Sequence, residues 1–321
     1  MNTFLITGFS GFVSKHFLEY LEKNHSGAVV YGLDIQHPDF DYNSFTRITC
    51  HFRKINLLDA EAVNEILIEC KPDYILHLAS YSSVAFSWEQ PVTAFVNNLN
   101  IFLNLVDQIR LLKLKCKVLS VGSSEEYGKV DPTQLPLREN GRVNPISPYA
   151  VARVSQEQLS AVYSAGYGLD IVMTRSFNHI GPGQLDKFVI PSFVKKILEA
   201  NASGQTHIDV GNVSLVRDFV DVRDVVSAYY MLLMHGRKGE IYNICSGNGI
   251  TLENMLMLIM KQIGCEMEIR TIDSLVRPND NEVIVGSFEK IQQELGWKPK
   301  FTIEESINDI ILFWKNKLSV S

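Results

Sequence analysis

The sequence lacks the features that mark disulfide-stapled, metal-binding, membrane and nucleic-acid-binding proteins. Its five cysteines lie far apart, without a CxxC pair or a histidine spacing suited to zinc. Residues 1–7 have no basic flank of a signal peptide, and the longest later apolar run, 225–234, is far shorter than the roughly 18 residues of a membrane span. The formal charge of −6 gives no positive field for a nucleic-acid backbone. We expect a cytoplasmic protein with no metal, no membrane contact and no nucleic-acid partner.

Alternating strand and helix patterns fill the first half of the 321 residues. They predict an α/β fold with a doubly wound parallel sheet. The expected strands are 3–7, 29–34, 74–78, 117–121 and 171–175, and the expected helices are 13–23, 60–70, 92–112 and one starting after Ser147-Pro148. After about residue 176 the pattern becomes irregular, with a loop at 177–184 and helices at 190–200, 252–263 and 303–314. We expect a Rossmann-type dinucleotide-binding domain over 1–175, with 217–240 packing back on it, and a smaller α/β substrate domain over 176–321.

A glycine-containing turn follows the first expected strand. Gly8 and Gly11 stand where a tight turn lets backbone N–H groups approach a pyrophosphate at a helix N-terminus, although Ser14 occupies the position of a third glycine. The glycine pair alone fits a purely structural turn equally well. Asp34 ends the second strand, 23 residues after Gly11, where a carboxylate accepts from both ribose hydroxyls and repels a 2′-phosphate. The two features together predict a dinucleotide cofactor, with NAD(H) favoured over NADP(H).

A second set of residues belongs to the carboxyl edge of the sheet, where ligands of such folds bind. Ser123 follows one strand, and Tyr149 and Arg153 lie four residues apart on one face of a helix. A hydroxyl, a tyrosine and a cation can together move a proton at a carbinol oxygen, because a positive charge favours the tyrosinate. The structural alternative makes Tyr149 a core residue and Arg153 a surface partner of Glu157.

The longer motifs resemble those of a known family, the extended short-chain dehydrogenase/reductases. The matching segments are GSSEEYG, SPYAVAR, RSFNHIGPGQ with FVIPSF, VGNVSLVRDFVDVRDVVSAY, EIYNICSG, RPNDNEVIVGS and LGWKPKFTIEESI. The resemblance spans the chain and, within the family, is greatest to the GDP-6-deoxy-4-keto-D-mannose reductases, which form GDP-D-rhamnose. It implies a nucleotide-sugar oxidoreductase that forms a homodimer through a four-helix bundle of 92–112 and 149–165.

The resemblance also implies roles for individual residues. Ser123 would hydrogen-bond the sugar carbonyl, and Tyr149 would donate the proton. The expected cofactor contacts are Gly8, Ser10, Gly11, Phe12, Asp34, Asn56, Leu57, Leu78, Ala79, Asn98, Tyr149 and Arg153. The expected contacts of a GDP-linked sugar are Ser83, Ser124, Glu125, Asn178, Val189, Arg217, Arg277 and Asp280. Asn56 is equally compatible with a plain loop residue, and Arg217 with a structural salt bridge to Asp218, Asp221 or Asp224.

The sequence departs from the family pattern in three places. Arg153 replaces a usual lysine, Ser14 replaces a glycine, and Ile101 with Phe102 replaces a Gly-Thr pair. The arginine keeps the charge but changes the donor geometry toward the cofactor.

Other reactions stay open. Glu125 occupies the position of a catalytic glutamate in related 4,6-dehydratases, and Glu126 beside it offers a second carboxylate. A C4 dehydrogenase, an epimerase or a heptose substrate is also compatible, and so is a non-catalytic nucleotide sensor that lost the lysine.

Overall fold

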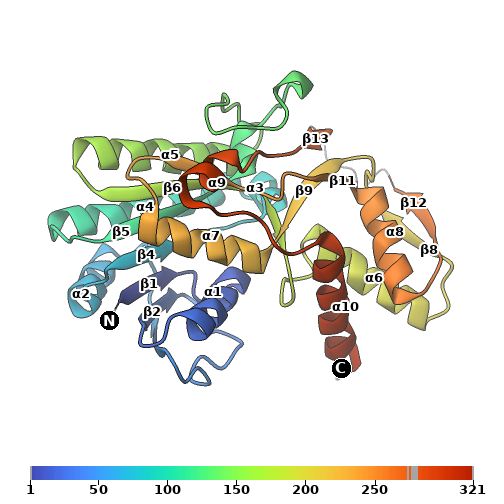
Figure 1. The fold of residues 1–321 in the computed structure, drawn as a ribbon, viewed down its shortest axis with the longest axis horizontal. Coiled ribbons are helices and arrows are strands. Elements are labelled where there is room, and N and C mark those ends of the chain that lie inside the picture. The colour runs from blue at the N-terminus through green and yellow to red at the C-terminus, as the bar shows by residue number, and fades with distance from the viewer. Residues whose placement is uncertain (1, 273–274, 276–280, 320–321) are drawn as a thin grey trace.

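A seven-stranded parallel sheet forms the centre of the molecule. The structure is a computed structural model, and it describes residues 2–272, 275 and 281–319. The strand order is β10-β6-β5-β4-β1-β2-β3 (Figure 1). These strands are β1 Thr3–Thr7, β2 Val29–Asp34, β3 Thr49–Lys54, β4 Tyr74–His77, β5 Lys117–Ser123, β6 Asp170–Ser176 and β10 Ile241–Ile244. The predicted doubly wound α/β fold is confirmed.

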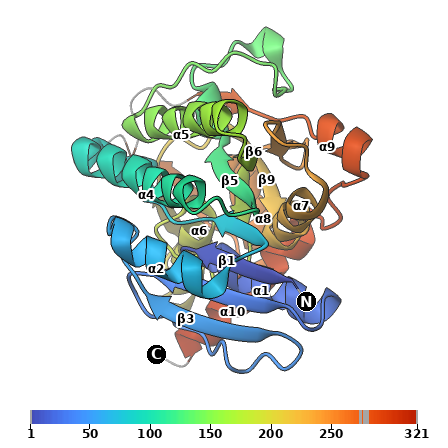
Figure 2. The ribbon, with the colours of Figure 1, turned by 90° about the vertical axis from the view of Figure 1, so that its left-hand side faces the viewer.

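Helices cover both faces of this sheet (Figure 2). Helices α1 (Phe12–Asn24) and α7 (Val222–His235) pack on one face, and α2 (Ala60–Cys70), α4 (Pro91–Leu111) and α5 (Pro148–Gly166) pack on the other. Short helices α3 (Val84–Glu89) and α9 (Glu289–Leu295) complete this part, together with the 3₁₀ turns η1 (Ser124–Tyr127) and η2 (Pro132–Gln134). Burial on both faces explains why the central strands β1 and β4 read as almost continuous apolar runs.

A second cluster of elements lies beyond the carboxyl edge of the sheet (Figure 1). Its helices are α6 Val189–Ala202, α8 Leu252–Ile263 and α10 Ile303–Ser319. Its strands are β7 Asn178–Ile180, β8 His207–Val210, β9 Val216–Asp221, β11 Gly249–Thr251, β12 Glu268–Thr271 and β13 Val283–Ile284. These helices share a separate apolar core that includes Phe193, Met255 and Trp314.

Three elements differ from the expected pattern or add to it. Residues 177–184 are not entirely loop, because Asn178–Ile180 pairs with β9 as strand β7. A short helix, Val84–Glu89, precedes α4 and was not expected. Strand Ile241–Ile244 belongs to the large sheet, where it pairs with β6. Each of these elements is too short to show a period in the sequence, and the two strands depend on partners far along the chain.

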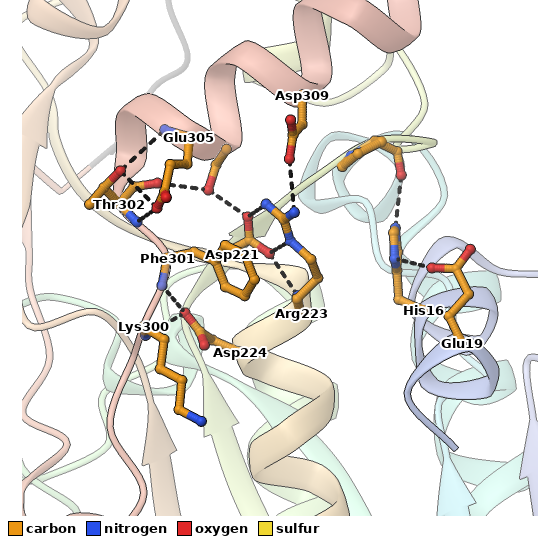
Figure 3. A network of polar contacts seen from close by, with 12 residues as sticks. His16, Glu19, Asp221, Arg223, Asp224, Lys300, Phe301, Thr302, Glu305 and Asp309 are labelled. Carbon is orange, nitrogen blue, oxygen red and sulfur yellow. Dashed lines mark hydrogen bonds and ion pairs between the residues drawn. The ribbon is translucent and has the colours of Figure 1, made fainter. Parts of the chain in front are cut away.

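A polar network joins the second cluster to the sheet (Figure 3). Asp221 caps α7 by accepting from Arg223 N, and the Arg223 guanidinium binds both Asp221 and Asp309 of α10 at 2.8 Å. Asp224 accepts from the backbone N–H groups of Lys300 and Phe301, each at 2.9 Å. Since α7 packs against the sheet, these contacts fix the position of α10 relative to the sheet.

Candidate functional site

The carboxyl ends of the parallel strands place the predicted site residues along one edge. Gly8 follows β1, Asp34 ends β2, Leu78 and Ala79 follow β4, and Ser123 ends β5. This is the edge at which doubly wound sheets bind their ligands.

The glycine turn fits tightly against the end of β4. Gly8 has a φ of +73°, and a Cβ at this position would lie 2.8 Å from the backbone nitrogen of Ala79. Gly11 is the N-cap of α1, and no described side chain caps that helix end. Ser14 is fully buried in the first turn, so the serine fits where the family has glycine. The turn thus leaves the N-terminal N–H groups of α1 for an anion, as a dinucleotide pyrophosphate requires.

Asp34 is held beside this turn by backbone donors. Ser10 N donates to its Oδ2 at 3.0 Å, and Gln36 N donates to its Oδ1 at 3.1 Å. The Ser10 hydroxyl donates to the Gln36 carbonyl at 2.6 Å, which closes the loop around the carboxylate. The glycine turn and the oriented carboxylate together fit the pyrophosphate and adenosine ribose of a dinucleotide.

Three other predicted cofactor contacts have structural partners. Asn56 Oδ1 accepts from Leu58 N at 3.0 Å, as in an Asx turn, and Leu57 is buried with its carbonyl accepting from Asn104. Asn98 accepts from Tyr81 N at 2.7 Å and donates to Tyr81 O at 3.1 Å. Asn98 therefore fixes the segment that follows β4, and its direct contact with a cofactor stays a prediction.

Helix α4 carries large apolar side chains at the two positions where the family has a Gly-Thr pair. Ile101 and Phe102 are buried against the sheet, and the Phe102 ring lies 5.6 Å from the ring of His77. His77 is fully buried, and burial lowers its pKa to about 3, so its imidazole is neutral. Its Nδ1 lies 2.9 Å from the Thr7 hydroxyl, which in turn accepts from Ala79 N. The neutral histidine thereby stabilises the strand end that contacts Gly8.

Helix α5 carries Tyr149 and Arg153 into the site. Ser147 caps it by accepting from Ala150 N, and Pro148 is its first residue, as the sequence predicted. Arg153 Nε donates to the Tyr149 hydroxyl at 3.2 Å. Because that oxygen accepts from Arg153, the phenolic proton is directed elsewhere and can be donated.

The structural alternative is wrong for Arg153. Arg153 is only 5% exposed, so it is not a surface residue. Glu157 instead forms a bidentate pair with Arg175, with both oxygens 2.8 Å from guanidinium nitrogens. Tyr149 is buried, at 6% exposure, as the structural alternative has it, and its hydroxyl lies against the guanidinium, so its role in catalysis stays a prediction.

Ser123 is fixed by its own 3₁₀ turn. Its Oγ accepts from Glu125 N at 3.2 Å, and its backbone N donates to Glu126 Oε1 at 2.7 Å. The Ser123 hydroxyl can therefore still donate to a carbonyl oxygen. Helix α5 packs against both β5 and this turn, which places Ser123 and Tyr149 on adjoining elements.

Glu126 is a buried acid that the motif alone did not distinguish from Glu125. It is fully buried and lies 3.9 Å from Arg175 Nε, beside the Glu157–Arg175 pair. Burial first, and then the nearby charge of Glu157, raise its pKa well above the usual range. Glu126 thus supports the Ser123 turn from the protein interior, whereas Glu125 is only partly buried and is the carboxylate that the dehydratase alternative would use.

The expected substrate residues lie on segments that follow strands of the large sheet and on the second cluster of elements. Asn178 begins β7, Val189 begins α6, Ser124 is buried in η1, and Ser83 caps α3 by accepting from Phe86 N. Arg277 and Asp280 lie outside the described residues.

Arg217 lies on β9 and is half-buried. It donates from Nη1 to the carbonyls of Val216 and Asn281 at 2.9 and 2.8 Å. The carboxylates considered as its structural partners bind other groups: Asp218 accepts from Ser246, and Asp221 binds Arg223. Asp224 likewise accepts from backbone N–H groups next to α10.

Fold and site together define a dinucleotide-dependent enzyme of the extended short-chain dehydrogenase/reductase class. Residues 5–310 match the family model described as GDP-mannose 4,6 dehydratase. The chain is 31% identical to the GDP-6-deoxy-D-mannose reductase of Pseudomonas aeruginosa over 98% of this chain and 97% of the relative. It belongs to this family of nucleotide-sugar enzymes.

Solved structures agree with this assignment. RMD from Pseudomonas aeruginosa, complexed with NADPH, superimposes with a TM-score of 0.86 at 31% identity, covering 99% of this chain and all of the other. The UDP-glucose 4-epimerase of Thermus thermophilus, in complex with NAD, gives a TM-score of 0.86 at 29% identity, covering 98% and 99%. The neighbours therefore include enzymes with either dinucleotide.

Proposed function

We propose that the protein is an NAD(H)-dependent reductase of the C4 keto group of a GDP-6-deoxy-4-keto-mannose-type sugar. Its product would be GDP-D-rhamnose or the heptose analogue. The observation that carries the proposal is the buried Tyr149–Arg153 pair at 3.2 Å, on the same sheet edge as the glycine turn and Asp34. The 31% identity to a GDP-6-deoxy-D-mannose reductase supports the choice of substrate.

The residues of the site have complementary tasks in this reaction. Ser123 donates a hydrogen bond to the C4 carbonyl oxygen, and Tyr149 gives that oxygen its proton. Arg153 stabilises the tyrosinate that remains, because a positive charge beside a phenolate favours its charged form. A nicotinamide cofactor, when bound, would supply the hydride. Gly8, Gly11 and the α1 N-terminus would hold its pyrophosphate, and Asp34 its adenosine ribose.

The preference for NAD(H) rests on Asp34. A carboxylate at the ribose edge accepts from two hydroxyls but repels a third phosphate. The RMD neighbour is complexed with NADPH and the epimerase neighbour with NAD, so the preference needs measurement. Comparing the affinities for NADH and NADPH decides it, and equal or tighter binding of NADPH would refute it.

Recognition of the nucleotide diphosphate is assigned to the elements facing the sheet edge. Arg217 and Asn178 belong to paired strands β9 and β7, and Val189 begins α6. We expect Arg217 to bind phosphate oxygens together with Arg277, since a guanidinium matches their geometry. Ser83, Ser124, Glu125 and Asp280 complete the expected substrate contacts.

A second reaction is favoured by one observation. Glu125 directly follows Ser124 in the 3₁₀ turn and supplies the acid or base that a 4,6-dehydratase requires. C4 oxidation and epimerisation would use the same tyrosine without Glu125. Mass spectrometry of the product separates these possibilities, since dehydration removes water, oxidation removes two hydrogens and epimerisation leaves the mass unchanged. A sensor without catalysis would bind the nucleotides and convert none.

The proposal includes a homodimer in the cytoplasm. Apolar residues are exposed along α4 and α5, including Val92 at 74%, Val96 at 47% and Val162 at 56%. A second copy would cover them in a four-helix bundle. Light scattering on the purified protein tests the dimer. Among the described residues, no helix is both long and apolar enough to cross a bilayer.

The decisive experiment is turnover with a defined sugar. Purified protein should consume NADH, followed by absorbance, when given GDP-6-deoxy-4-keto-mannose, and the product should be GDP-D-rhamnose by mass and NMR. The matching UDP and dTDP sugars are the controls. If a UDP or dTDP sugar is reduced faster, the base assignment is wrong, and if none is reduced the reductase assignment fails.

A further inference from the structure

The guanidinium of Arg153 is held by more than Tyr149. Its Nη1 donates to the Val121 carbonyl at 3.0 Å and to Gln156 Oε1 at 2.9 Å, and its Nη2 donates to Ser80 Oγ at 2.5 Å. With Nε on Tyr149, four of its five N–H donors have acceptors among the described residues. The plane of the group is therefore determined by contacts on every nitrogen.

Gln156 is itself fixed from behind. It is 2% exposed, and its Nε2 donates to Ser120 Oγ at 2.9 Å and to the Val121 carbonyl at 3.3 Å. Its amide nitrogen thus faces β5, which turns its oxygen toward Arg153. Ser160 binds Ser120 at 3.1 Å in the same contact between α5 and β5, but it has no bond to Arg153. The chain thereby offers a residue of the same network as a control.

Ser80 reaches the other side of the guanidinium from the segment after β4. Gln156 and Ser80 come from different elements, one from α5 and one from the sheet edge. A guanidinium is a rigid, planar fork, so aiming Nε at Tyr149 requires both Nη atoms to be anchored. An ammonium is compact and rotates freely, and needs no such anchors.

We propose that Gln156 and Ser80 are positioning residues that orient Arg153 toward Tyr149. Their importance for turnover rests on the proposed function, whereas their effect on the guanidinium does not. The proposal predicts a conditional dependence: both residues matter while position 153 is arginine and lose their importance when it is lysine.

The first test observes the guanidinium directly. In protein labelled with ¹⁵N-arginine, the Arg153 signals are assigned by their loss in Arg153→Lys. Rotation of the fork should be hindered in the parent and in Ser160→Ala, giving separate Nη signals. Gln156→Leu should average them. Unchanged Arg153 signals in Gln156→Leu would overturn the proposal, whatever the substrate proves to be.

The second test is a double-mutant cycle on the reaction. Gln156→Leu should lower kcat by about tenfold with KM for the sugar nearly unchanged, because losing one hydrogen bond to a charged group has about this effect. In the Arg153→Lys background the same change should cost less than about threefold. Ser160→Ala should stay within about twofold of the parent.

The outcomes separate the two proposals. An equal loss from Gln156→Leu in both backgrounds would show that Gln156 only joins α5 to β5, and would refute positioning. If the parent turns over no GDP-4-keto sugar, the reductase proposal fails and the NMR result still decides positioning. Ser80→Ala removes the Nη2 acceptor outside the helix, and it replaces Gln156→Leu in both tests if that variant does not fold.

Discussion

Replacing Glu126 by glutamine tests whether the buried acid beneath the site is neutral in the folded protein. Glutamine keeps an oxygen that can accept from Ser123 N, now at 2.7 Å, but it cannot ionise. Burial and the neighbouring Glu157 raise the pKa of Glu126 above its unfolded value of 4.5. Between the unfolded and the folded pKa, the folded state therefore retains a proton that the unfolded state has released.

The sign of the pH dependence follows from this difference in bound protons. Below pH 4.5 both states hold the proton and the contribution of Glu126 to stability is complete. As the pH rises toward the raised folded pKa, the free energy of unfolding falls by up to about 1.4 kcal/mol per pH unit from this group. Above the folded pKa the contribution is lost.

Urea unfolding of the parent and of Glu126→Gln at about pH 6, 7.5 and 9 measures how the free energy of unfolding depends on pH. The free energy of unfolding of the variant should increase relative to that of the parent as the pH rises. The difference between the two pH curves isolates the titration of Glu126. Glu139→Gln removes the carboxylate that accepts from Asn243 N, without touching Ser123 N, and controls for net charge.

Glu126→Ala completes the series by leaving the part-buried Ser123 N–H without its acceptor. We expect a loss of about 2–4 kcal/mol from the unpaired donor and the cavity together. If the parent and Glu126→Gln show parallel pH profiles, Glu126 is ionised in the folded state, and the claim that burial raises its pKa is refuted.

Four further predictions concern the site itself. Tyr149→Phe should keep NADH affinity, measured by fluorescence, yet lose about 100-fold or more in single-turnover rate, and a full-rate variant would remove the tyrosine from the reaction. Asp34→Asn should narrow the preference for NADH over NADPH by about tenfold, and an unchanged ratio would place the discrimination elsewhere. Arg217→Ala should weaken GDP binding by about 1.5–3 kcal/mol in calorimetry, whereas a purely structural arginine would leave that affinity intact. Gly8→Ala should destabilise the protein by about 3 kcal/mol or more and weaken NADH binding, while Gly27→Ala, with a φ of +84° but open space around its Cβ, should cost only about 1–2 kcal/mol.

Local sequence signals predicted the elements whose causes are local. Residues 60–70 and 252–263 form helices with those bounds, and the Ser147-Pro148 pair starts α5. Strand β7 depends on a partner about forty residues away in β9, so no local pattern could reveal it. Strand β10 likewise takes its place in the sheet from its pairing with β6.

The surroundings of Arg153 show the same limit at the level of side chains. Helical spacing placed Arg153 below Tyr149, and the same spacing would also place Gln156 beside Arg153. Ser80, in contrast, is separated from Arg153 by 73 residues, and only the fold brings them together. The burial of Glu126 also depends on Glu157 and Arg175 from two other elements, so the motif could not distinguish it from Glu125.

The late position of β10 in the chain has a consequence for synthesis. A ribosome that has released only the first 176 residues has produced six strands of the sheet but not the strand that pairs with β6, nor helix α7 that covers Phe4 and Ile6. Such a nascent chain exposes an unpaired apolar edge and an uncovered sheet face, both of which favour aggregation. A gene fragment cut at this point would therefore yield an insoluble product, whereas one that extends through Ile244 would contain all seven strands and α7.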